Sequence, residues 1–165
     1  MKDSSNICLS CGLCCDGTLI GFVQLENDEL PRMKEVMDII DDNGNGFFLN
    51  PCNKYCAGCT IYSERPKQCA SFECKLLKNF EQKELNFDSA VEIVNAIKEK
   101  KSAIEKKVAN LQLELKSPSF YFKMVELKKW LRKNKESSLT QDHLALILDL
   151  EQLDSLVARN MGVSY

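Results

Sequence analysis

The chain has 165 residues, 44% of them hydrophobic, with one histidine and a formal net charge of −2. This length fits one domain, or one compact domain with an appendage. The near-balanced charge excludes a general electrostatic attraction to nucleic acid, and a single histidine excludes zinc-protease motifs, which need two.

The start of the chain is polar. Residues 1–6 read Met-Lys-Asp-Ser-Ser-Asn, and no apolar run in the sequence approaches the roughly 18 residues that span a membrane. We therefore expect no secretory signal, no membrane association and a cytoplasmic location. In that reducing compartment, disulfides are disfavoured.

The first half of the chain predicts short elements. Residues 18–25 predict a strand, and residues 27–41 predict a short helix capped by Asn27 or Asp28. A polar turn follows at residues 42–46, and residues 47–49 predict a short buried strand. The apolar stripe of the predicted helix consists of Met33, Val36, Met37 and Ile40.

The second half predicts three helices. The first begins near residue 88, where Ser89 and Glu92 have capping-box spacing. The second begins at Ser117-Pro118, with serine as the cap and proline in the first turn. The third is capped by Thr140, carries His143 in its first turn and stops at Gly162. The predicted apolar stripes are Ala90, Val94, Ile97, Ile104, Val108, Leu111 and Leu115; Phe120, Met124, Leu127 and Leu131; and Leu144, Ile147, Leu148, Leu150, Leu153, Leu156 and Val157.

These elements predict a mainly α fold with a small, irregular, metal-bound lobe and short strands. Residues 1–78 form the cysteine-cluster lobe in this prediction. Residues 79–165 form the helical region, whose helices pack on the lobe as one compact unit.

The nine cysteines are confined to the first half. The first cluster reads C-x2-C-x2-C-C over residues 8–15, and the second spans residues 52–74. A C-x2-C step lets two sulfurs turn back onto one ion, while nearby backbone amides donate to the thiolates. Two such dense clusters therefore predict a metal site rather than disulfides or buried thiols.

The cysteine pattern resembles a known family. C-x2-C-x2-C-C followed by C-x-I-Y-x2-R-P-x2-C is similar to the cysteine-cluster family of zinc- or iron-chelating domains, of which flagellin lysine N-methylase is a relative. The match covers Cys8 to Cys74, but this chain has Ala70 where the family usually has arginine, and Phe48-Leu49 precedes a cysteine instead of following one. Cys56 looks additional, as a possible extra ligand. The resemblance implies eight ligands: Cys8, Cys11, Cys14, Cys15, Cys52, Cys59, Cys69 and Cys74.

Residues around the second cluster are expected to support the ligands. Pro66 fixes the turn and Arg65 donates toward thiolate or carbonyl, with Tyr62 close by. Eight thiolates suit two four-sulfur sites, so we expect up to two zinc ions, with an iron–sulfur cluster as the alternative. Two zinc sites would lower the net charge to about −10. Four cations lie in or beside the second cluster and can offset it: Lys54, Arg65, Lys67 and Lys75.

Two classes of function stay open. In the first, which we favour, the metal is mainly structural and supports a binding or interaction module with an unknown protein partner. In the second, the chain is an iron–sulfur redox protein or a flagellin N-methylase-like enzyme component. No catalytic constellation and no glycine-rich cofactor motif is visible. Residues 98–135 carry twelve Lys and Arg against four Glu, which is most simply a solvated helical surface and gives no clear nucleic-acid signal.

Overall fold

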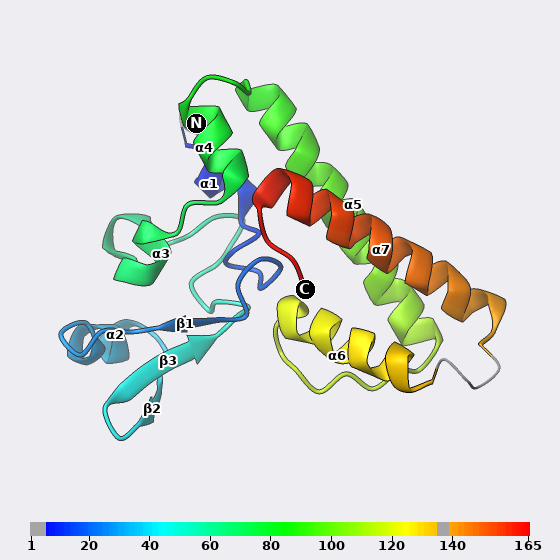
Figure 1. Ribbon diagram of the computed structural model, residues 1–165. Coiled ribbons are helices and arrows are strands. Elements are labelled where there is room, and N and C mark those ends of the chain that lie inside the picture. Colours follow the sequence, from blue (N-terminus) through cyan, green and yellow to red (C-terminus); the bar gives the residue numbers. More distant parts are fainter. Residues whose placement is uncertain (1–5, 135–138) are drawn as a thin grey trace. The chain divides into compact units, whose positions relative to one another are not determined.

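The computed structural model describes residues 6–134 and 139–165 (Figure 1). Within these residues the α-helices are α1 (Ile7–Cys11), α2 (Leu30–Val36), α3 (Lys67–Ser71), α4 (Lys75–Glu81), α5 (Phe87–Asn110), α6 (Phe120–Lys133) and α7 (Gln141–Met161). The strands are β1 (Phe22–Gln24), β2 (Ile40–Asp42) and β3 (Asn45–Leu49), and a 3-10 turn, η1, covers Tyr62–Glu64. The predicted fold class, mainly α with short strands, is confirmed.

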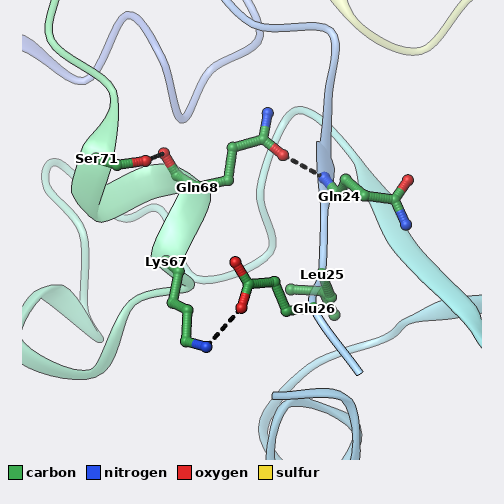
Figure 2. Close-up of a pocket in the computed structure, with 6 residues that line it drawn as sticks. All are labelled: Gln24, Leu25, Glu26, Lys67, Gln68 and Ser71. Atoms are coloured by element: carbon green, nitrogen blue, oxygen red, sulfur yellow. Dashed lines mark hydrogen bonds and ion pairs between the residues drawn. The ribbon is translucent and has the colours of Figure 1, made fainter. Parts of the chain in front are cut away.

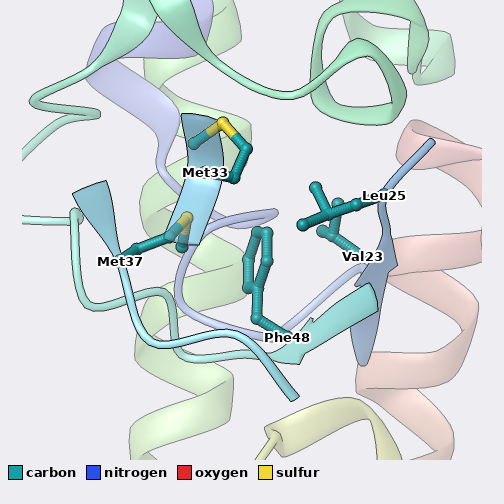
Figure 3. Close-up of a cluster of buried hydrophobic side chains, with 5 residues drawn as sticks. All are labelled: Val23, Leu25, Met33, Met37 and Phe48. Atoms are coloured by element: carbon teal, nitrogen blue, oxygen red, sulfur yellow. The ribbon is translucent and has the colours of Figure 1, made fainter. Parts of the chain in front are cut away.

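The strands form one small antiparallel sheet in the order β1-β3-β2. Val23 of β1 pairs with Phe48 of β3, so both side chains point to the same face. That face covers a cluster of five buried side chains: Val23, Leu25, Met33, Met37 and Phe48. Figure 3 shows them converging on the ring of Phe48. Burying each such side chain contributes about 1.5–3 kcal/mol, so this cluster is the apolar base of the cysteine region.

Three elements of this region differ from their predictions. The strand predicted over residues 18–25 is shorter, because it pairs with β3 over Phe22–Gln24 alone. The helix predicted over residues 27–41 is only Leu30–Val36. Its N-cap is Glu29, whose side chain makes no capping bond to this helix. Ile40 therefore leaves the predicted helical stripe: it lies in β2, is 47% exposed and pairs with Phe47.

The described residues divide into two compact units. The first contains the residues up to Glu73 together with Pro118–Tyr121, and the second contains Cys74–Ser117 and the rest of the chain from Phe122. Pro118–Tyr121 belongs to the first unit because, for example, the N–H of Tyr121 donates to the carbonyl of Gly17 over 2.7 Å.

In the second unit, α5 packs along α7, and α4 contacts both. Their facing residues recur at steps of three and four, so each helix buries one stripe. The fully or nearly buried side chains are Ala90, Val94, Ile97 and Ile104 of α5, and Leu146, Leu150, Leu153, Val157 and Met161 of α7. None of the described helices has an apolar stretch that would cross a membrane.

The predicted ends of α7 are right, whereas the predicted starts of α5 and α6 are wrong. Thr140 caps α7, with His143 completing the capping box, and Gly162 ends it at a φ of 72°; both were predicted. The predicted cap Ser89 is wrong, because Asn86 caps α5 and accepts from the N–H of Ser89. The helix predicted to start at Ser117-Pro118 begins at Phe120 instead, and the hydroxyl of Ser117 binds Glu126.

Candidate metal centre

The first cysteine cluster is built on a single helical turn. The side-chain oxygen of Asn6 accepts from the N–H groups of Cys8 and Leu9 at 3.1 and 3.4 Å, which starts α1. Gly12 ends α1 in the left-handed conformation, with φ 68°. Cys8 and Cys11, one turn apart, therefore lie on the same side of this short helix.

A backbone hydrogen bond joins the two clusters. The N–H of Cys52 donates to the carbonyl of Cys15 over 2.7 Å. This bond fixes the start of the second cluster beside the end of the first. Cys52 and Cys69 both pack, partly buried, against the hydrophobic cluster under the sheet. The sheet core thus positions two cysteines of the second cluster.

The loop between Cys56 and Cys59 is a tight turn. Tyr55 pairs with Cys59 in an isolated antiparallel bridge, and the N–H of Cys56 donates to the carbonyl of Gly58 over 2.9 Å. Gly58 adopts a φ of 156°, a conformation that side chains other than glycine rarely adopt. Closing this loop turns Cys59 back toward Cys15 and Cys52.

Four thiols of the first unit are close enough to act on one another electrostatically. Burial, reinforced by charge repulsion from the thiols of Cys59, Cys52 and Cys69, raises the pKa of Cys15 to about 12. Burial and the thiols of Cys52 and Cys59 likewise raise the pKa of Cys69 to about 12. For Cys52, burial is again the main cause of a raised pKa, and Cys59 adds to it. Every pair within the set Cys15, Cys52, Cys59 and Cys69 is therefore coupled.

Arg65 and Tyr62 lie next to this set. The guanidinium of Arg65 is 3.8 Å from the centroid of the Tyr62 ring and donates to the Tyr62 carbonyl over 2.7 Å. Its charge lowers the pKa of Cys69, against the larger effect of burial. The Tyr62 hydroxyl donates to Asn6 at 3.2 Å, so Arg65 and Tyr62 connect the second cluster to the cap of α1.

The remaining cysteines have different surroundings. Cys56 is exposed. Cys74 belongs to the second unit, where its sulfur caps α4 by accepting from the N–H of Leu77 at 3.4 Å. The assignment of eight ligands therefore stays a prediction, and the structure brings together four of them as one coupled set. All nine cysteines are thiols rather than disulfides.

Three residues that support the cysteines carry little sequence signal. Asn6 could have been found, because asparagine directly before a helix is a common N-cap. Tyr55 and Glu29 could not, because their contacts come from residues far away in the sequence. Tyr55 packs against Gly12 so closely that a β-carbon there would lie 2.5 Å from its ring.

The four thiols are donors of the kind that a thiophilic ion prefers, but they do not surround one common position. Among residues 6–134 and 139–165, no three Cys, His, Asp or Glu side chains already share a position suited to a metal. Sulfur donors suit zinc and iron–sulfur clusters. The raised pKa values of Cys15, Cys52 and Cys69 mean that these thiols keep their protons unless a cation replaces them. Metal binding would therefore draw the four side chains inward and release protons.

The fold and this cysteine set define a class, the cysteine-rich metal-chelating domains. Residues 7–108, more than half of the chain, match the family CxxCxxCC, described as "Putative zinc- or iron-chelating domain". The chain belongs to this family. No curated protein and no solved structure matches it.

Proposed function

We propose that Cys15, Cys52, Cys59 and Cys69 bind one zinc ion, and that the ion mainly holds the first unit together as a binding module. The observation that carries this proposal is that one compact unit holds Cys52 bonded through its backbone to Cys15 and packed, together with Cys69, against one sheet core. The electrostatic effects of the four thiols on one another support it. The bond between Cys52 and Cys15, at 2.7 Å, anchors the set independently of any charge.

A structural role follows from the number of donors. A zinc ion held by four thiolates has a closed, tetrahedral coordination and no open position for activating water. The bound ion would also offset the mutual repulsion of the four side chains once they are deprotonated to thiolates. Since the sheet core contains only five buried side chains among the described residues, metal binding would add stability that this small core lacks.

The experiment is elemental analysis combined with visible absorption on protein prepared anaerobically with both zinc and iron supplied. We expect a colourless protein that contains zinc, because zinc has a filled d shell. Brown protein with iron and acid-labile sulfide would replace zinc by an iron–sulfur cluster and favour the redox or methylase-like alternative. Protein that stays fully folded with no metal would refute the proposal.

The second predicted set of ligands remains a separate question for the same measurement. One ion per chain supports the coupled set alone, whereas two ions per chain support the larger prediction of eight ligands. We place the protein in the cytoplasm, where thiols stay reduced and available to a metal.

A further inference from the structure

Helix α3, which carries Cys69, is not stabilised by its own sequence. It spans five residues, Lys67–Ser71, and buries none of them. Its N-cap is Pro66, whose side chain makes no capping bond. An isolated helix this short is unstable in water, so contacts from elsewhere must hold it.

Glu29 supplies the missing cap from a distance. One oxygen of its carboxylate accepts from the backbone N–H of Lys67 at 2.6 Å, and the other accepts from the N–H of Glu26 at 2.9 Å. A carboxylate at this position satisfies an unpaired N–H of the helix and favours its dipole. Glu29 therefore ties the start of α3 to the segment that precedes α2.

Two further side chains of α3 reach the same segment, as Figure 2 shows. The Lys67 ammonium binds Glu26 at 2.6 Å and Asp28 at 2.8 Å. The side-chain oxygen of Gln68 accepts from the backbone N–H of Gln24 at 2.6 Å, on the edge strand β1. We call these contacts, made by Gln24, Glu26, Asp28 and Glu29 with Lys67 and Gln68, the α3 latch.

An open surface pocket lies where the latch crosses between α3 and the segment before α2. Its volume is about 390 Å³, and it is lined by Gln24, Leu25, Glu26, Lys67, Gln68 and Ser71. Apart from the contact of Cys69 with the sheet core, α3 is therefore held by polar bonds on the surface. Exposed ion pairs and hydrogen bonds are individually weak, and segments with few buried contacts open most readily.

From this arrangement we propose that the α3 latch controls how fast the metal leaves the cysteine set. Opening the latch frees α3 and carries Cys69 away, leaving three thiolates and a position open to an incoming thiol or chelator. This inference rests on the proposed function, because it takes Cys69 as a ligand. It adds that Cys69 is the ligand that leaves first when the metal exchanges.

The test compares Glu29→Ala and Gln68→Met with the wild type, all as the full chain. Arg32→Met is the matched control, because Arg32 forms an exposed ion pair with Glu64 at 3.0 Å in the same unit without touching α3. Hydrogen exchange of amides 67–72 reports the opening of α3. Zinc release to the colour-forming chelator 4-(2-pyridylazo)resorcinol reports retention.

Both latch variants should exchange the amides of α3 and release zinc roughly twofold to tenfold faster than the wild type, and Arg32→Met should do neither. Unchanged exchange in both variants would overturn the latch. Faster exchange with unchanged zinc release would show that Cys69 is not the exit and overturn the inference while leaving a metal site in place. A wild type that takes up no zinc would refute the proposed function itself.

Discussion

The backbone N–H of Cys52 donates to the carbonyl of Cys15 over 2.7 Å, and this bond joins the two cysteine clusters. It places the backbones of the two residues side by side. Cys59 and Cys69 come within electrostatic reach of Cys15 by different routes, one through a tight loop and the other on α3.

The first prediction concerns the ligand set. Cys59→Ser should lose the ion, because serine does not supply the thiolate that a four-sulfur site requires. Cys56→Ser should keep its metal, because Cys56 is exposed and outside the coupled set. Elemental analysis of the two purified variants is the measurement. Equal losses in both would make Cys56 a ligand.

The second prediction concerns Arg65. Arg65→Met should weaken zinc binding about 10- to 100-fold, because it removes the cation that favours the Cys69 thiolate. Arg65→Lys should fall in between, since lysine keeps the charge but loses the fork that donates to Tyr62 while stacking on its ring. Competition with a chelator of known affinity measures both variants. Wild-type affinity in Arg65→Met would assign Arg65 to the fold alone.

The third prediction concerns the contact between Gly12 and Tyr55. Gly12→Ala should destabilise the protein by about 2–4 kcal/mol, from a strained backbone and from overpacking against the Tyr55 ring. Gly44→Ala is the matched control, because Gly44 also has a positive φ, 89°, but nothing lies within 4 Å of its added β-carbon. Gly44→Ala should lose only the stability that the strained backbone costs, about 1 kcal/mol.

Urea unfolding followed by circular dichroism measures both glycine variants. If they lose the same stability, the contact with Tyr55 has no energetic role. Partial rescue of Gly12→Ala by a second change, Tyr55→Leu, would assign the excess to the ring.

The fourth prediction concerns acid sensitivity of the second unit. Asp149 on α7 is buried and binds Lys100 of α5 at 3.0 Å, and also Lys107. Burial alone would raise the pKa of Asp149, but the hydrogen bonds from Lys107 and Lys100 outweigh it and lower the pKa. The stabilisation is therefore fully present above the unfolded pKa of about 3.9 and is lost as the pH falls from there through the lower pKa of the folded state.

Asp149→Asn should accordingly cost about 2 kcal/mol at pH 7 and less at pH 3, because two lysines lose their partner only where Asp149 is charged. Glu151→Gln, an exposed carboxylate on the same helix, serves as control and should change little at either pH. Urea unfolding at both pH values measures this difference. A pH-independent loss would mean that the side-chain amide, rather than the missing charge, is responsible.

The sequence by itself determined the metal-binding class and the positions of the long helices. Cysteine spacing is a local property, and ions select donors by chemistry, so the clusters could be recognised before any fold was known. The buried parts of the α5 and α7 stripes were readable for a similar reason, because helical periodicity repeats over many residues. The predicted stripes were nevertheless too wide and too long, since Leu144 and Leu148 are exposed and Leu111 and Leu115 lie beyond the end of α5. Thr140 and Gly162 marked the ends of α7 because both capping signals act within one turn.

Tertiary structure decided which cysteines meet and what holds them. The coupling of Cys15 with Cys69 depends on a sheet core and a short helix that bring distant residues together, and no local pattern encodes that distance. Glu29 caps α3 across the fold, so its role is invisible in a sequence where it looks like the start of α2. Ile40 lies in a strand because pairing with Phe47 outweighed the helical spacing that suggested otherwise.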